Sequence, residues 1–230
     1  MSSAWSEFEH TLRTGESAFE HVFGTDYYAY LAARPDDSGR VDASVRAQNR
    51  HVLRTVLHAY PWGALGTVVD VGGGNGAFLA GLLTRFRQLR GTLLDQPHVL
   101  AGAPPVLAAA GVEDRCELVA GSFFDEVPAG AGGYVLKTIL HDWDDGRALA
   151  VLTAVRAAMR PDSRLIVLEA LLPPGDTYHV GKLLDLHSLV LVAGPDRDET
   201  DLRALLDRAG LRVSDVRPTD TLAILEAVPA

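Results

Sequence analysis

The chain has 230 residues, of which 47% are hydrophobic, and carries a net charge of −9 with a single cysteine, Cys116. This length suits one α/β domain rather than two, and the acidic balance argues against nucleic acid and anionic membranes as partners. One cysteine excludes an internal disulfide, and the lack of a signal peptide or an apolar run of roughly 18 residues indicates a cytoplasmic protein.

Residues 1–40 predict a helical cap made of short, aromatic-rich helices and ending in a polar turn at 35–39. The predicted main domain covers residues 41–230. It begins with a helix at 42–60, after which strands alternate with helices. This alternation predicts a doubly wound, mostly parallel, Rossmann-like seven-stranded sheet with helices on both faces. The strands are expected at 67–71, 91–95, 116–120, 134–137, 164–171, 211–217 and 221–228, and the helices at 75–88, 97–110, 144–159, 180–193 and 199–209.

A glycine-rich turn joins the first predicted strand to its helix. It contains Gly72, Gly74 and Gly76, follows Asp70 closely, and is succeeded by a second strand that ends in Asp95. Glycines at this edge of a parallel sheet let a ligand approach the backbone, and a carboxylate placed like Asp95 can accept both hydrogen bonds of a ribose diol. The turn and the acid predict an adenosine-containing cofactor. A nicotinamide dinucleotide and S-adenosylmethionine both satisfy the glycine pattern, and the acidic Asp70 favours the cationic methyl donor.

A second group of polar residues follows the fourth predicted strand, at the same edge of the sheet. His141 is a candidate general base there, since the unperturbed histidine pKa of about 6.5 lies near neutral pH. A histidine that caps the next helix beside Asp142 and Asp144 is an equally good interpretation, and the residues alone leave both open. Because adjacent acids at a helix start are usually caps, no metal site is expected at Asp144 and Asp145.

A series of motifs makes the chain recognisable over nearly its whole length. In chain order they are 13–19 (RTGESAF), 69–76 (VDVGGGNG), 94–97 (LDQP), 121–124 (GSFF), 136–143 (LKTILHDW), 165–169 (LIVLE) and 205–211 (LLDRAGL). The chain resembles the small-molecule O-methyltransferases that include plant phenylpropanoid and hydroxyindole enzymes and bacterial antibiotic-tailoring enzymes. The resemblance implies a class I methyltransferase fold and S-adenosylmethionine as the cofactor. It also implies methyl transfer to a hydroxyl, phenolic in kind, of a small aromatic natural product.

The resemblance assigns expected roles in cofactor binding and catalysis. For the cofactor, it implies that Gly72, Gly74 and Gly76 surround the methionine part and that Lys137 approaches the methionine carboxylate. Asp95 is expected to hold the ribose, Phe123 to pack near the adenine, and Trp143 to line the site. For catalysis, it implies that His141 is the base between Glu169 and Asp196. His187 is expected either to border the substrate pocket or to be a core residue.

The chain departs from the family pattern in three places. Ser122 stands where many relatives have an aspartate; its hydroxyl can still bond the adenine amine but brings no charge. Asp196 replaces a glutamate and is one methylene shorter. The resemblance leaves the family's N-terminal dimerisation domain without a counterpart in the sequence, so the chain is expected to be either a fragment or a trimmed member of the family. In both cases we expect weak self-association, apolar surface on residues 1–34, and room for a protein partner in place of that domain.

Three other functions stay open at this point. Some relatives use the same pocket for decarboxylation, hydroxylation or cyclisation. A trimmed member of the family can instead be a non-catalytic subunit that binds the cofactor for another protein. A nicotinamide oxidoreductase also remains compatible with the glycine turn alone.

Overall fold

The computed structural model describes residues 2–34, 36–37, 41, 53–171, 175–176, 180–192, 197–219 and 222–230. Within this part the chain forms a seven-stranded sheet with the order β3-β2-β1-β4-β5-β7-β6. The strands are β1 (Thr67–Val71), β2 (Arg90–Asp95), β3 (Cys116–Ala120), β4 (Gly133–Lys137), β5 (Arg164–Glu169), β6 (Leu211–Arg217) and β7 (Ala223–Pro229). β1 to β5 pair in parallel, and β7 is antiparallel to both β5 and β6. The predicted mostly parallel, doubly wound sheet is confirmed.

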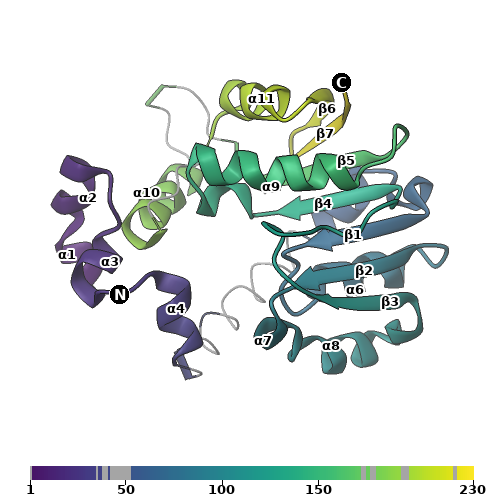
Figure 1. Ribbon diagram of the computed structural model, residues 1–230, viewed down its shortest axis with the longest axis horizontal. Helices are drawn as coiled ribbons and strands as arrows, with labels where there is room; N and C mark the ends of the chain where they lie inside the picture. Colours follow the sequence, from purple (N-terminus) through teal and green to yellow (C-terminus); the bar gives the residue numbers. More distant parts are fainter. Residues whose placement is uncertain are drawn as a thin grey trace.

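Helices cover both faces of the sheet (Figure 1). The core on one face joins the sheet to α9 (Asp145–Ala158) and α11 (Glu199–Arg208). The core on the other face joins it to α6 (Ala77–Arg85), α8 (Ala103–Ala110) and the helical residues 53–59. Neighbouring strand residues divide between these cores, since successive side chains point to opposite faces: Val69 and Val71 pack in the first and Val68 in the second.

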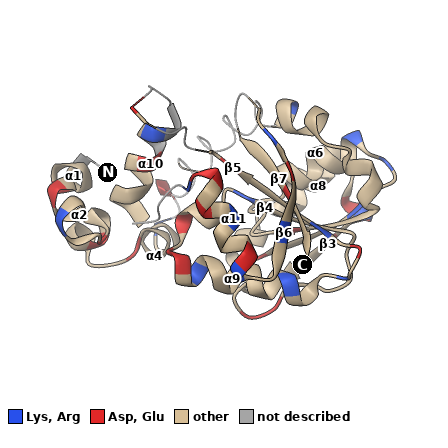
Figure 2. Ribbon diagram, turned by 90° about the horizontal axis from the view of Figure 1, so that it is seen from above, with Lys and Arg blue, Asp and Glu red and all other residues tan. Residues whose placement is uncertain are grey.

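The N-terminal helices are α1 (Ser2–Ser6), α2 (Phe8–Thr14), α3 (Ala18–Phe23) and α4 (Tyr27–Ala32). In Figure 1, α1, α2 and α3 lie beyond α10 (Val180–Val192), away from the sheet, and Figure 2 shows α1 and α2 on the same side of α10. α4 lies below α10 in Figure 1 and contacts the segment after β4 through Tyr28. Phe19 is buried in a third cluster with Val190 and Leu191 of α10, and the Ser17 hydroxyl donates to the Leu191 carbonyl over 2.8 Å. These contacts pack the N-terminal segment against α10, and α10 connects it to the rest of the chain.

Some of the expected apolar surface is present on the N-terminal helices. Leu12 is 67% exposed, and Trp5 and Val22 are also exposed, whereas Phe19 and Ala18 are buried. Most of the expected boundary near residue 40 and most of the helix at 42–60 lie outside the described residues, so the division into a cap at 1–40 and a domain at 41–230 stays a prediction.

Several expected elements differ in extent. The helix expected at 97–110 is two helices, α7 (Pro97–Leu100) and α8, separated by Ala101 and Gly102. The helix expected at 75–88 begins at Ala77 and ends at Arg85, since residues 72–76 form the turn. Short 3-10 helices, which have no distinctive periodicity, occur at η1 (Trp62–Leu65), η2 (Glu113–Arg115) and η3 (Leu140–Asp142). Among the described helices, none combines the length and the hydropathy that a membrane span requires.

Candidate functional site

The sheet places two loops side by side at the point where its strand order reverses. β1 and β4 are hydrogen-bonded neighbours, yet the helix after β1 covers one face and the helix after β4 covers the other. Open α/β sheets bind ligands outside the carboxyl ends of their strands at such a point. The loop 72–76 follows β1 and the segment 138–143 follows β4, so the two predicted groups of site residues share one edge.

The turn 72–76 requires glycine, and without side chains its backbone stays accessible to a ligand. Gly72, Gly74 and Gly76 all have positive φ, the left-handed region that favours glycine. A Cβ on Gly72 would lie 2.7 Å from Ile139 Cδ1 and 3.1 Å from Phe123 Cε1. The loop after β1 therefore packs directly against the residues that follow β3 and β4.

Asp95 connects the end of β2 to the glycine turn. Its Oδ2 accepts the Gly74 N–H over 2.8 Å, and its Oδ1 accepts the Gln96 N–H over 2.7 Å. Burial raises the pKa of Asp95, while these two N–H donors lower it. A carboxylate oxygen has two lone pairs, so each oxygen keeps an acceptor position for a ligand such as a ribose diol.

Asp70 is a buried carboxyl directly beneath the glycine turn. It is 1% exposed, and its Oδ2 has no hydrogen-bond partner among the described residues. Burial raises the pKa of Asp70 to about 7; Lys137 opposes this rise and Asp95 adds to it. Burial lowers the pKa of Lys137, which reaches its hydroxyl neighbour Thr138 over 3.3 Å. A buried acceptor beside a cation suits the amino and carboxylate groups of a methionine moiety, so these residues fit S-adenosylmethionine.

The raised pKa of Asp70 predicts a pH-dependent stability. Between its usual pKa of 3.8 and about 7, the folded chain holds a proton that the unfolded chain has released. The free energy of unfolding of the ligand-free protein should therefore fall as pH rises through this window. Thermal unfolding across roughly pH 5 to 8 measures the slope. Asp70→Asn should flatten it and Asp114→Asn, at an exposed site, should not; equal slopes in all three proteins would contradict the assignment.

Aromatic rings line the edge between the loops after β3 and β4. The ring of Trp143 lies 5.0 Å from Phe124 and 6.3 Å from Phe123 in edge-on geometry, and Tyr28 of α4 stacks on its other side at 6.5 Å. The Ser122 hydroxyl accepts the Phe124 N–H over 3.2 Å and so belongs to the turn itself. Phe123 therefore lies against the glycine turn, with Trp143 and Ser122 beside it, and the role of these three residues around an adenosine stays a prediction.

His141 lies in the 3-10 helix η3, four residues past the end of β4, with a carboxylate near each ring nitrogen. Nδ1 is 3.8 Å from Glu169 Oε2, and Nε2 is 3.3 Å from Asp142 Oδ1. Asp142 in turn accepts the Tyr28 hydroxyl over 2.6 Å. Burial, and next the Asp142 carboxylate, raise the pKa of Tyr28, so this hydroxyl remains a donor.

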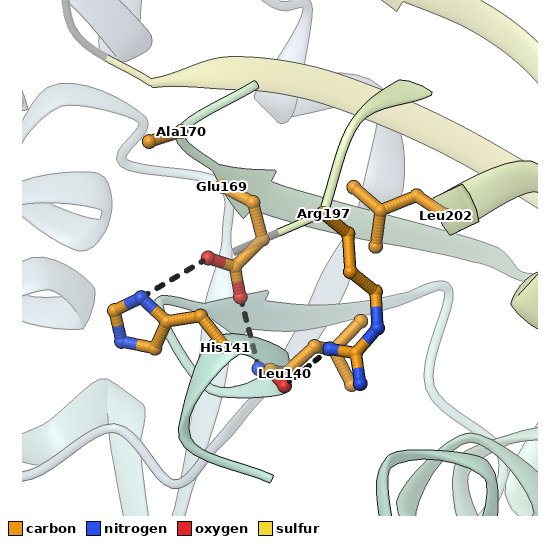
Figure 3. Close-up of a pocket in the computed structure, with 6 residues that line it drawn as sticks. All are labelled: Leu140, His141, Glu169, Ala170, Arg197 and Leu202. Carbon is orange, nitrogen blue, oxygen red and sulfur yellow. Dashed lines mark hydrogen bonds and ion pairs between the residues drawn. The ribbon is translucent and has the colours of Figure 1, made fainter. Parts of the chain in front are cut away.

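Glu169 ends β5 and contacts the backbone that carries His141. It is 3% exposed, and its Oε1 accepts the N–H groups of Ile139 and Leu140 over 3.0 and 2.9 Å. Figure 3 shows the carboxylate between the imidazole and the Leu140 backbone. The resemblance predicts Glu169 beside the ring, but no feature of the sequence indicates its contacts with the backbone.

The structure does not place every expected residue in the site. Asp196 lies outside the described residues. His187 accepts the Trp5 indole N–H at Nδ1 over 3.3 Å and stacks on that ring, and burial lowers its pKa. Tyr28 was missed because it is one of many aromatic residues in the N-terminal segment, and Arg197 because nothing in the sequence around it indicates its buried contacts. No group of three or more potential metal ligands occurs among the residues that the structure describes.

Residues 5–212 match the family model of the O-methyltransferase domain. The chain belongs to this family, which confirms the resemblance inferred from its motifs.

Two kinds of relative define the similarity further. The chain is 43% identical to the O-demethylpuromycin-O-methyltransferase of Streptomyces alboniger over 235 residues, which cover 98% of the chain and 62% of that protein. It resembles the structure of the mitomycin 7-O-methyltransferase with a TM-score of 0.95 at 36% identity, over 99% of the chain and 68% of that structure.

A third similar structure was solved with ligands. It is an O-methyltransferase from neocarzinostatin biosynthesis, in complex with S-adenosylmethionine and 2-hydroxy-5-methyl naphthoic acid. The TM-score is 0.88 at 35% identity, over 99% of the chain and 68% of that structure. The chain thus spans less than two thirds of the Streptomyces alboniger relative and slightly more than two thirds of the two structures.

Proposed function

We propose that this chain transfers a methyl group from S-adenosylmethionine to a hydroxyl of a small aromatic molecule, with His141 as the general base. The observation that carries the proposal is the position of His141: it lies between two carboxylates at the sheet edge that also bears the glycine turn and Asp95. Support for an aromatic hydroxyl acceptor comes from the relative that was solved with a hydroxynaphthoic acid.

The methyl donor, when bound, supplies an already activated methyl group on a sulfonium, so the protein needs to orient the acceptor and remove its proton. Asp95 would accept the ribose hydroxyls, and Asp70 with Lys137 would face the charged methionine groups. The aromatic residues Phe123 and Trp143 would exclude water from the adenosine side. Orientation of two reactants in one site supplies a large part of the reduction of the barrier.

His141 would take the proton of the acceptor hydroxyl. A phenol with a pKa of about 10 costs roughly 4 kcal/mol to ionise at pH 7, at about 1.36 kcal/mol per unit. A base within hydrogen-bond distance lowers this cost because the proton leaves as the new bond forms. Glu169 on the Nδ1 side would favour the tautomer that carries its proton on Nδ1, so that the lone pair on Nε2 takes the acceptor proton. Glu169 and the Asp142 carboxylate beside Nε2 would then stabilise the imidazolium that results.

Replacing Glu169 with Gln should test this orienting role. The amide oxygen can still accept the N–H groups of Ile139 and Leu140, so the turn should keep its shape, while the negative charge near His141 is lost. We expect a fall in turnover that is smaller than the loss caused by removing the imidazole, with donor affinity retained. Glu226→Gln in β7 removes a partly buried, ion-paired carboxylate at a distance from the site and serves as the matched control. If Glu169→Gln turned over at the wild-type rate, the orienting role would be wrong.

Product mass tests the reaction itself. Incubation with S-adenosylmethionine carrying a labelled methyl group and a panel of phenols should give products heavier by one CH2 unit and containing the label. Decarboxylation, hydroxylation or cyclisation would give other masses. Turnover that required a second protein would support the non-catalytic subunit, and binding of a nicotinamide dinucleotide in place of the methyl donor would overturn the proposal.

A further inference from the structure

A buried arginine contacts the segment that carries His141. Arg197 lies two positions before the first residue of α11 and is 6% exposed. Its Nη1 donates to the Leu140 carbonyl over 2.7 Å, and its Nη2 donates to the Trp143 carbonyl over 2.9 Å. Nε and Nη2 both donate to Asp145 Oδ1, over 3.1 and 2.8 Å. Arg197 and Leu140 are 57 positions apart in the chain.

These bonds lie on both sides of His141. Leu140 and Trp143 flank the histidine and its neighbour Asp142, so one guanidinium holds the two carbonyls between which the base is placed. Glu169 accepts the N–H of the same Leu140. Figure 3 shows Glu169 and Arg197 reaching the Leu140 backbone from different elements, Glu169 at its N–H and Arg197 at its carbonyl.

The segment has a strained backbone at its start. Thr138 has φ +52°, the only positive φ at a non-glycine residue among those described. This region is unfavourable for a β-branched residue, and such a conformation persists only where the surrounding structure holds it. Glu169 and Arg197 provide bonds that hold the residues directly after Thr138.

An arginine suits this position better than a lysine. Its planar guanidinium presents five N–H donors in a fixed arrangement, whereas an ammonium is a compact charge on a flexible stem. Three acceptors are engaged here, and the carboxylate among them, Asp145, is 64% exposed at its side chain. Because a buried charge is costly unless it is hydrogen-bonded, the bonds to the two carbonyls are what make burial of Arg197 tolerable.

We propose that Arg197 is a positioning residue for the reaction: it fixes the backbone of η3 so that the His141 imidazole faces the acceptor hydroxyl. This inference rests on the proposed role of His141 as the base. The guanidinium of Arg197 contacts the backbone around His141 and the Asp145 carboxylate, so its effect on the rate passes through the orientation of His141.

Substitution of Arg197 tests the proposal. In Arg197→Gln we expect kcat to fall about ten- to a hundredfold, the size of effect that small displacements of a catalytic group produce. The calorimetric affinity for S-adenosylhomocysteine should fall much less than kcat; a small loss is expected because Arg197 also holds the carbonyl of Trp143, whose ring is proposed to line the donor site. Arg197→Lys keeps the charge near Asp145 but loses the fixed donor arrangement, so it should recover thermal stability more fully than kcat. Arg203→Gln in α11 breaks an exposed ion pair with Glu199 and should leave both quantities unchanged.

Two further readouts separate positioning from general damage. The loss in Arg197→Gln should be large for acceptors of high pKa and small for acidic phenols, which need no base. In a His141→Ala background the same substitution should cause no further loss, because the group that it positions is already absent. A loss independent of acceptor acidity, or one that multiplies with the loss of His141→Ala, would overturn the positioning role while leaving the proposed function intact.

Failure of the proposed function itself has a different signature, since His141→Ala alone would then retain its rate with neutral phenols. If Arg197→Gln does not fold, Asp145→Asn provides the test from the other side of the contact. It weakens the bond that orients the guanidinium at an exposed residue, and it should give a smaller loss with the same dependence on acceptor acidity. A wild-type acceptor profile for Asp145→Asn would then overturn the proposal.

Discussion

Replacing His141 with Ala is expected to lower turnover about a hundred- to ten-thousandfold, the usual effect of a positioned base. Affinity for the methyl donor should stay nearly the same, because Asp95, Asp70 and the glycine turn, which are proposed to hold the donor, belong to other segments. Initial rates with one neutral phenol, together with calorimetry on S-adenosylhomocysteine, measure the two quantities independently.

The acidity of the acceptor sharpens this expectation. A phenol that is already ionised at the assay pH has no proton to lose, so the deficit of His141→Ala should shrink as the pKa of the acceptor falls. His58→Ala is a matched control, since this histidine is exposed and its ring bonds the Arg54 carbonyl of its own helix. Wild-type rates in His141→Ala would mean that proximity alone drives the reaction, and loss of donor binding would mean that His141 is structural.

The second large effect is expected at Asp95. Replacing it with Ala removes a charge-assisted bond worth about 1.5–3 kcal/mol, so donor affinity should weaken roughly ten- to a hundredfold. Asp95→Asn keeps an acceptor oxygen for one of the two N–H donors, Gly74 or Gln96, and loses the charge and the second acceptor. It should therefore weaken binding less than Asp95→Ala. Titration calorimetry gives the dissociation constants, and Asp114→Ala on the surface should leave them unchanged. An unaltered constant in Asp95→Ala would refute the ribose assignment.

Local patterns in the sequence were enough to predict the fold and the glycine-turn part of the candidate site. Short β-branched runs and the helical periods between them are set by near neighbours in the chain. Together they predicted a mostly parallel seven-stranded sheet, which the structure confirms, whereas the order of the strands was decided by the tertiary structure. The glycine turn and Asp95 could also be predicted from the sequence, because their chemistry depends on residue type at the ends of two consecutive strands. The break between α7 and α8 was not predicted, since Ala101 and Gly102 are weak signals within a helical pattern.

The environment of His141 was decided by the tertiary structure. Tyr28 and Asp142 are 114 positions apart, and Arg197 bonds a carbonyl 57 positions away. Their partners are backbone atoms or distant side chains, which leave no pattern in the sequence around either residue. Which carboxylate lies beside which ring nitrogen depends on strand order and on the path of the chain after β4. The sequence by itself determined which chemical groups the protein has at the edge of its sheet, and only the fold determined which of them touch.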